Sequence, residues 1–540
     1  MTSTSVAYDA PPGGDGVNQR SIFFASFMTL VAAGMGFSIF GGVLGDVGTQ
    51  FGFTKSDLGA ITGGGLAGFG LTIIFFSFFA DKVGYKPLLI GAACLHLLSV
   101  AMRLAATPIF EASGKDAAYQ MLYWGAFVFS LGNGLCEAAI NPLTATLFPR
   151  NKTHYLNILH AGWPLGLVIG GLINYFFAGP TAKITHVRWE ILLGLYALPA
   201  LYYGFIVLTN RFPISEAKAA GLTVGQMVKH VFAPLLLFLF LIHAMIGYVE
   251  LGTDGWIQNI LNPIIGNKAF LLFVYTSLLM FILRFFAGPI VHRINPLGLL
   301  FISAIFGAVG LYWLGTVNTV SMAFAAATVF ALGKTFYWPT MLGVIGERFP
   351  KAGAIAMGIS GGIGMLSAGF LGGPGIGYTQ DRQAAAQLQA ENPQAYQAVK
   401  ADEPNHFLFF KPVEGLNQAK VAVIADKGKT LQEDLAFAQK VGKDDPNLQK
   451  LQQWYQSVDM PPATQEQVVS ANIYGGRRAL QITAAIPAAM AVCYLLLVFY
   501  FMAKGGYKAV HLDASGREVE VTHEATPGEA MTGGVPGPVR

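Results

Sequence analysis

Twelve apolar stretches, each long enough to cross a lipid bilayer, succeed one another along the 540 residues of this chain. About 20 apolar residues suffice for a membrane-spanning helix, whose backbone hydrogen bonds are satisfied within the segment. The first six stretches are 22–44, 58–80, 87–106, 123–147, 156–177 and 191–208. The second six are 234–257, 269–291, 296–314, 320–345, 355–377 and 480–502. The sequence therefore predicts an all-α membrane protein with twelve transmembrane helices.

The composition favours the same class. The chain is 53% hydrophobic and 12% charged, whereas soluble domains carry about 25% charged residues. Lys and Arg gather in alternate connections between the spans, which predicts that both termini are cytoplasmic. The net charge of +4 is thus an orientation signal and does not indicate a nucleic-acid surface. Cys94, Cys136 and Cys493 lie in apolar spans and suggest neither a disulfide framework nor a metal site.

A sequence pattern repeats between the two sets of spans. Leu131-Gly132 precedes Phe148-Pro149-Arg150, and Leu332-Gly333 precedes Arg348-Phe349-Pro350, each element being shifted by 201 residues. A looser repeat joins Phe78-Phe79-Ala80 to Phe285-Phe286-Ala287. The chain is therefore expected to form two pseudo-symmetric six-helix bundles, the architecture of solute carriers whose binding site lies between the halves.

The expected domains correspond to these bundles. They are a cytoplasmic segment (1–20), the first bundle (21–208), a cytoplasmic linker (209–233), the second bundle (234–504) and a tail (505–540). The tail is rich in Gly, Pro and acidic residues, so we expect it to be disordered. About 100 residues, 378–476, separate the last two spans as an outward-facing helical insertion. This insertion is either a solvated cap or a dedicated binding domain.

Polar side chains lie on single helical faces of three spans. An ionisable group in the membrane is costly, so it usually faces a cavity and has a function. Spacings of three and four residues bring each set onto one face. The sets are Asn133, Glu137 and Asn141 in span four, His243, Glu250, Asp254 and Gln258 in span seven, and Lys334, Tyr337, Trp338 and Met341 in span ten.

Each of these residues also has a structural interpretation. Glu137 could be a buried acid bonded to a neighbouring span, and Lys334 could form a static ion pair with Glu250. His160 and His243 could pack or hydrogen-bond. The aromatic residues could be core side chains, or could stack on a sugar ring whose hydroxyls meet Asn, Glu and Lys. These aromatic residues are Trp256, Tyr337 and Trp338.

Glycines repeat every four residues in several spans, including Gly162, Gly166 and Gly170, and Gly358 with Gly362. Small residues at this spacing let helix backbones approach closely. They indicate either tight packing or a smooth surface along which the two halves rock.

The stretch from Ala80 to Lys86 resembles the signature of the major facilitator superfamily between helices two and three, with Ser77 where that signature prefers glycine. The resemblance covers all twelve spans and implies that spans one, four, seven and ten line a central cavity. It also implies a gate in which Asp81 lies against a helix N-terminus and a basic side chain such as Arg150. Arg284 and Arg293 are the gate candidates of the second half, where Gly288 replaces the acid.

A narrower resemblance is to the fucose–proton symporter branch of this superfamily. It rests on span four (Gly134 to Pro142), the start of span five (Tyr155 to His160) and span seven (Glu250 to Ile257). The resemblance implies that Glu137 is the proton-linked acid and Asn157 its polar partner. The carboxylate that this branch carries in its first helix has no counterpart between Phe37 and Leu44.

These observations predict a secondary transporter that works by alternating access, as a proton symporter of a sugar or polyol. A facilitator and a sodium-coupled carrier are alternatives, since Glu137, Glu250 and Asp254 supply oxygen ligands. A solute sensor or a membrane-embedded transferase would be of a different class, although no reactive cluster of His, Asp or Ser is visible. We expect no cofactor, no metal and no enzyme activity. We expect a monomer in a bacterial inner membrane, with a solute and a coupling ion as partners.

Overall fold

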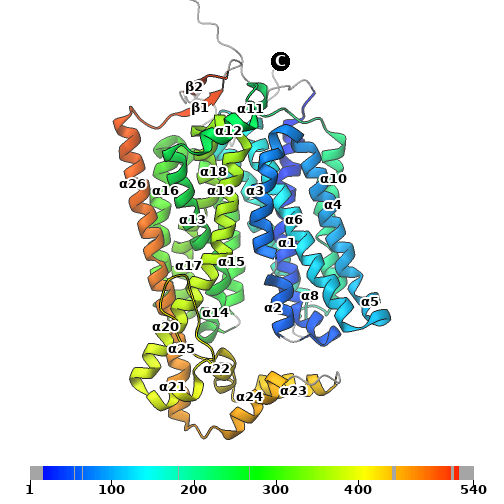
Figure 1. The fold of residues 1–540 in the computed structure, drawn as a ribbon, viewed down its shortest axis with the longest axis vertical. Helices are drawn as coiled ribbons and strands as arrows, with labels where there is room; N and C mark the ends of the chain where they lie inside the picture. Colours follow the sequence, from blue (N-terminus) through cyan, green and yellow to red (C-terminus); the bar gives the residue numbers. More distant parts are fainter. Residues whose placement is uncertain are drawn as a thin grey trace, which may run out of the picture.

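The computed structural model describes residues 16–53, 55–63, 65–179, 182–266, 268–440, 446–512 and 516–521. In this part of the chain almost all regular structure is helical, apart from one two-stranded antiparallel sheet. Figure 1 shows two helical halves side by side. The predicted all-helical class is therefore confirmed.

The N-terminal half contains the helices of the first six predicted spans. Several spans are interrupted and form two consecutive helices. The helices are α1 (Gln19–Phe51), α2 (Lys55–Gly63), α3 (Gly65–Val83), α4 (Tyr85–Leu104), α5 (Ala106–Ser113), α6 (Lys115–Leu147), α7 (Lys152–His160), α8 (Gly162–Phe177), α9 (Trp189–Gly194) and α10 (Ala197–Thr209).

The C-terminal half has the same plan with more interruptions. Its helices are α13 (Pro234–Gly247), η1 (Tyr248–Gly252), α14 (Thr253–Ile265), α15 (Lys268–Arg284), α16 (Ala287–Leu314), α17 (Val320–Lys334), α18 (Tyr337–Arg348), η2 (Pro350–Ala352), α19 (Gly353–Ser367), η3 (Ala368–Gly372), α20 (Gly373–Glu391), α25 (Pro462–Thr483) and α26 (Ala485–Ala503). The segments η1 and η3 are π-helical. Helix α16 is bent at Asn295, whose positive φ of 56° separates the predicted eighth and ninth spans.

Nine helical runs among the described residues are long and apolar enough to cross a membrane. Helices α3, α6 and α15 also lie within the bundles, but they do not meet this criterion of length and apolar composition. The chain is therefore a multi-pass membrane protein, and the count of twelve spans stays a prediction.

The two ends of the bundles differ (Figure 1). One end, which we call the linker end, holds α11 (Glu216–Ala219), α12 (Val224–Val231) and the sheet of β1 (Ala509–Leu512) and β2 (Glu518–Val521). The other, the insertion end, carries α21 (Pro393–Val399), α22 (Gln418–Ala425), α23 (Lys429–Lys440) and α24 (Pro446–Ser457).

The structure corrects the prediction that the tail is disordered throughout. Residues Ala509 to Val521 form a hairpin in which Ala509 pairs with Val521 and Leu512 with Glu518. Residues 522–540 lie outside the described part of the chain, as do residues 1–15 of the predicted N-terminal segment. On strand β1 of this hairpin, the side chains of Ala509, Val510 and Leu512 are buried.

The insertion begins later and ends earlier in the chain than predicted. Helix α20 continues to Glu391 and α25 starts at Pro462, so the last two spans extend into it as a pair of packed helices. Buried apolar residues, including Leu388, Val399 and Val468, form a separate small core there. This core makes the insertion a folded unit, and the choice between a cap and a binding domain stays a prediction.

The glycine repeats divide between the two interpretations. On α8, a Cβ at Gly166 would lie 2.5 Å from the carbonyl oxygen of Val31 on α1, so this repeat packs two helices of one half. On α19, a Cβ at Gly358 would lie 1.5 Å from Ser77 Oγ on α3, across the two halves. The second repeat therefore lies where the halves could move against each other, and the first does not.

Candidate functional site

Four helix interruptions lie at or next to buried polar residues of the interior. They are the break at Ala161 between α7 and α8, the π-helical η1, the turn at Phe285 and Phe286 after α15, and the turn at Thr335 and Phe336 after α17. Irregular backbone at membrane depth occurs where it is buried in protein or lines a cavity. Interrupted helices also mark the binding sites of many carriers.

Two prolines explain which carbonyl oxygens are free. Pro164 lies four residues after His160, and Pro339 lies four residues after Thr335. A proline has no N–H to give to the carbonyl four residues before it, and its ring keeps that carbonyl at a distance. The carbonyl oxygens of His160 and Thr335 therefore need partners outside their own helices.

Arg284 supplies both partners and thereby connects three of the interruptions. Its Nη1 donates to the carbonyl oxygen of His160 at 2.5 Å, its Nε to that of Thr335 at 2.9 Å, and its Nη2 to Glu250 Oε1 at 3.1 Å. The Arg284 side chain is buried, as is Glu250. Because His160 belongs to the N-terminal half, this guanidinium ties the two halves together. The sequence pointed to Arg284 as a gate residue, whereas the structure places it in the centre.

A second set of hydrogen bonds leads from Arg284 into the N-terminal half. Asn141 Nδ2 donates to Glu137 Oε2 at 2.7 Å, and Asn141 Oδ1 lies 2.9 Å from His160 Nε2. Glu137 is also close enough to Arg284 for the two charges to interact. Two buried carboxylates, Glu137 and Glu250, thus flank one guanidinium from opposite halves.

The C-terminal half contains two cation–carboxylate pairs in the interior. Lys334 Nζ pairs with Asp254, and Glu250 pairs with Arg284, so Lys334 does not form the static ion pair with Glu250 that was its structural alternative. A narrow cleft adjoins Lys334 and Asp254 between α14, α15 and α17, with only about 20 Å³ of space that water can enter. Gln258 and Thr276 also line it, which gives the cleft polar groups on two of its walls.

Four predicted cavity residues face elsewhere. Asn133 Oδ1 lies 2.9 Å from His96 Nε2 on α4, and the Tyr337 hydroxyl donates to the carbonyl oxygen of Ser303 on α16. The Trp338 ring packs edge-on against His243, 4.7 Å between centroids. Trp256 packs against α20, where a Cβ on Gly377 would lie 3.0 Å from its ring. All four therefore have the structural roles that were the alternative interpretation.

The halves also meet at the linker end. Asp81 Oδ2 accepts from the backbone N–H of Ala354, in the first turn of α19, at 3.1 Å. This is the predicted contact of Asp81 with a helix N-terminus, and the Lys218 charge of the linker acts on the same carboxylate. Arg150 and Arg293 are both exposed, and their part in a gate stays a prediction.

Two further pairs of side chains join the halves nearby, and of these four residues only Asn157 was predicted. Thr153 donates to Glu347 Oε1 through its Oγ1 at 2.6 Å and its N–H at 3.2 Å. Asn157 Nδ2 donates to Thr340 Oγ1 at 3.1 Å. Together with Asp81 these contacts form what we call the linker-end gate. Glu347 directly precedes the repeated Arg348-Phe349-Pro350, and this position was the available sequence signal for it.

The C-terminal hairpin covers this gate. The Tyr507 hydroxyl donates to Glu347 Oε2 at 2.7 Å, and Arg348 Nη1 donates to the carbonyl oxygen of Lys508 at 2.5 Å. Burial raises the pKa of Tyr507 well above its ordinary value. The hydroxyl therefore stays protonated and acts as the hydrogen-bond donor to Glu347. Glu347 thus binds the C-terminal tail through Oε2 and the N-terminal half through Oε1.

Comparison with known proteins identifies the family. The model of the major facilitator superfamily matches residues 26–373, which is more than half of the chain. The chain belongs to the major facilitator superfamily. Its members' transport activity agrees with the predicted class, and no curated protein gives a significant match to this sequence.

Solved structures of the superfamily share the fold at low identity. The Escherichia coli fucose–proton symporter FucP in its outward conformation is 16% identical, with 67% of this chain and 93% of FucP covered and a TM-score of 0.56. The proton–xylose symporter XylE of the same organism is 16% identical, with 69% and 90% covered and a TM-score of 0.56. A bacterial homologue of the human lysosomal transporter Spinster, inward-facing, is 15% identical, with 90% and 98% covered and a TM-score of 0.55.

Two carboxylates of the C-terminal half are arranged around cations. Glu250 and Asp254 face Arg284 and Lys334. Among the described residues, no group of three or more His, Cys, Asp or Glu side chains lies close enough together to hold a metal ion.

The close approach of α3 and α19 predicts that Gly358→Ala opens the linker-end gate. The added methyl would clash with Ser77, so the two helices must separate. In a background without the native cysteines, an Ala145→Cys reporter, buried opposite Gly346, should react with an impermeant maleimide several times faster. Gly41→Ala, where an added Cβ meets nothing within 4 Å, is the control.

A double variant tests whether faster labelling comes from the clash with Ser77 or from a general loss of stability. Ser77→Gly combined with Gly358→Ala removes the hydroxyl and Cβ that the new methyl would meet, and should restore slow labelling. Equal labelling rates for Gly358→Ala and its parent would contradict the close contact.

The hairpin predicts a weaker gate in Tyr507→Phe. The change removes one hydrogen bond to a carboxylate, a contact that contributes about 1.5–3 kcal/mol. Labelling of the Ala145→Cys reporter should therefore rise roughly tenfold or more, since 1.4 kcal/mol is a factor of about ten. Tyr500→Phe, on the exposed face of α26, should leave the rate unchanged, and a similar rise there would point to a nonspecific effect.

Proposed function

We propose that this superfamily member is a secondary active transporter that carries a small polar solute, a sugar or related polyol, together with protons. The observation that carries the proposal is the buried connection from Glu137 through Asn141 and His160 to Arg284 and Glu250. This connection brings ionisable groups of both halves around one guanidinium. A change of charge on a group of one half therefore changes the electrostatic interactions of the other half.

The proposed cycle uses this shared guanidinium. Removal from water disfavours a charged carboxylate, so Glu137 is the group that takes up the proton. Once Glu137 is neutral, Arg284 interacts with Glu250 alone, and the bond of Arg284 to His160 is the contact that must break for the halves to separate. Solute hydroxyls would bind next to Lys334 and Asp254, in the narrow cleft beside the centre, which must widen to admit a sugar.

The substrate class is supported by the fold relatives and by the cleft. FucP and XylE are described as symporters of protons with fucose and xylose, and the fold is what this chain shares with them. The polar groups around the cleft, a Lys, an Asp, a Gln and a Thr, are suited to sugar hydroxyls.

The proposal includes the placement of the protein. We propose twelve spans, with the linker end in the cytoplasm and the insertion outside, in a bacterial inner membrane and as a monomer. The Lys and Arg residues at the linker end support this orientation. The contacts of the linker-end gate then make this an outward-facing or occluded arrangement, closed toward the cytoplasm.

Flux through proteoliposomes tests the function. Purified protein should accumulate radiolabelled fucose, xylose or a related sugar when the exterior is acidified, and a protonophore should abolish the accumulation. Flux that depends on a sodium gradient would show that sodium, and not the proton, is the coupling ion. Downhill flux indifferent to both gradients would indicate a facilitator. Solute binding without flux would indicate a sensor, and bond cleavage or transfer without flux would indicate a transferase.

A further inference from the structure

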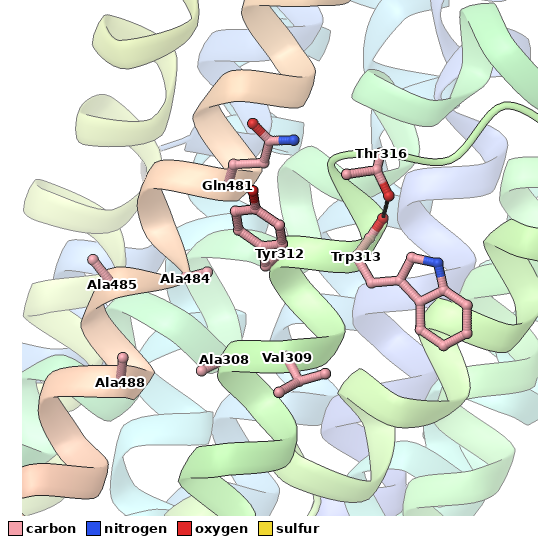
Figure 2. A pocket seen from close by; sticks show the side chains of 9 residues that line it. All are labelled: Ala308, Val309, Tyr312, Trp313, Thr316, Gln481, Ala484, Ala485 and Ala488. Atoms are coloured by element: carbon pink, nitrogen blue, oxygen red, sulfur yellow. Dashed lines mark hydrogen bonds between the residues drawn. The ribbon is translucent and has the colours of Figure 1, made fainter.

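A groove between α16 and the junction of α25 with α26 lies away from the central site (Figure 2). Its floor is formed by Ala308 on α16 and by small residues of the last span, and its volume is about 1020 Å³ including the open side. The small residues of the last span are Ala484, Ala485 and Ala488. Because these side chains end at Cβ, the two helices leave a channel wide enough for a hydrocarbon chain.

The groove opens toward the lipid. Figure 1 places α26 at the outer edge of the C-terminal half, next to α16. Val309 and Tyr312 on the groove wall are more than half exposed, as are Val492 and Leu496 further along α26. Exposed apolar residues of this kind form the hydrocarbon-facing surface of a membrane protein, so the groove is continuous with that surface.

Gln481 and the neighbouring Arg478 lie at the end of the groove that points toward the insertion. Gln481 lines it one turn from the break at Ala484, and Arg478 Nη1 donates to Gln481 Oε1 at 2.6 Å. Arg477 instead points to the end of α16, where its Nη2 donates to the carbonyl oxygen of Val317 at 2.5 Å. The Nε atom of Arg478 is buried and has no hydrogen-bond partner among the described residues.

We propose that this groove binds a phospholipid of the leaflet at the insertion end, with one acyl chain along the alanines and the phosphate on Arg478. A guanidinium binds phosphate with charge-assisted hydrogen bonds, and the Nη2 group of Arg478 is the donor left for a phosphate oxygen beside the Nη1 bond to Gln481. Gln481, held by Arg478, and the half-exposed Tyr312 lie at the same end and supply further polar contacts near the ester level. The proposal does not depend on the transported solute.

Native mass spectrometry of the full chain in detergent tests the site. Phosphatidylglycerol, phosphatidylcholine and diacylglycerol with identical acyl chains are added in turn, and bound lipid is counted. Both phospholipids should be retained, with diacylglycerol bound about tenfold less because it lacks the phosphate. Arg478→Gln should lower phospholipid retention to the diacylglycerol level, and Ala485→Phe, which fills the groove, should lower all three.

Leu496→Phe, on the exposed face of α26 outside the groove, is the matched control and should bind as the parent does. Thermal unfolding of each variant establishes that it is folded, and Ala485→Phe tests the groove independently of Arg478. Equal retention of phospholipid by parent, Arg478→Gln and Ala485→Phe would overturn the proposal, because the lipid would then be annular. Equal binding of diacylglycerol and phospholipids would overturn the phosphate contact and with it the proposed site.

Discussion

Glu137→Gln is expected to abolish concentrative uptake while leaving solute exchange across the membrane intact. Gln has nearly the same shape and its amide oxygen can still accept from Asn141 Nδ2, but it carries no titratable proton. Because solute binding is then no longer linked to a proton, the imposed pH gradient cannot drive accumulation, and the ratio of internal to external solute should fall to about one. The measurement is uptake of labelled sugar into proteoliposomes with an imposed pH gradient, beside counterflow without one.

The control for this prediction is Glu190→Gln, which removes a carboxylate that pairs with the exposed Arg188 far from the centre. Its uptake should match that of the parent. Accumulation by Glu137→Gln that is still sensitive to a protonophore would show that another group carries the proton. Loss of both accumulation and counterflow would instead assign Glu137 to the solute site or to folding.

Arg284→Met is expected to cause the largest loss of stability. The variant removes the bonds to His160, Thr335 and Glu250 at once and leaves the Glu250 carboxylate buried without its cation. Breaking a buried pair by removing one partner costs about 3–5 kcal/mol. We expect a clear fall in the thermal unfolding midpoint in detergent and no measurable flux.

A second substitution distinguishes the cost of the unpaired Glu250 charge from the cost of the lost Arg284 packing. Glu250→Gln in the Arg284→Met background removes that charge and should recover part of the stability but not the flux. Arg293→Met, which changes an exposed arginine of the same half, should unfold like the parent. If Arg284→Met and Arg293→Met unfolded at the same temperature, the central role of Arg284 would be refuted.

The helical periodicity of the sequence placed Glu137 and Asn141 of span four on one face, where they hydrogen-bond to each other, but it did not predict the ion pairs of span seven. Glu250 and Asp254 are four residues apart, so an ideal helix directs both toward one neighbour. The structure has a π-helical segment from Tyr248 to Gly252, and its wider turn rotates the residues after it. Asp254 therefore reaches Lys334, and Glu250 is left for Arg284.

The aromatic residues of span ten show the same effect. Lys334 and Tyr337 share a face only if the helix is continuous, but the chain turns at Thr335 and Phe336. After the turn Tyr337 points to Ser303 inside the C-terminal half and Trp338 packs on His243. Pro339 was the available sign of this interruption, since a proline releases the carbonyl four residues before it.

The sequence by itself determined the membrane class, the two-bundle plan, the family signature around Asp81 and the ionisable residues of the interior. These properties depend on apolar length and on residues near each other in the chain, which are visible without a fold. Only the tertiary structure decided that Arg284 is central, which carboxylate meets which cation, and that Tyr507 closes over Glu347. Most of these contacts join segments tens to hundreds of residues apart, and helix interruptions set their direction, so local spacing alone does not encode them.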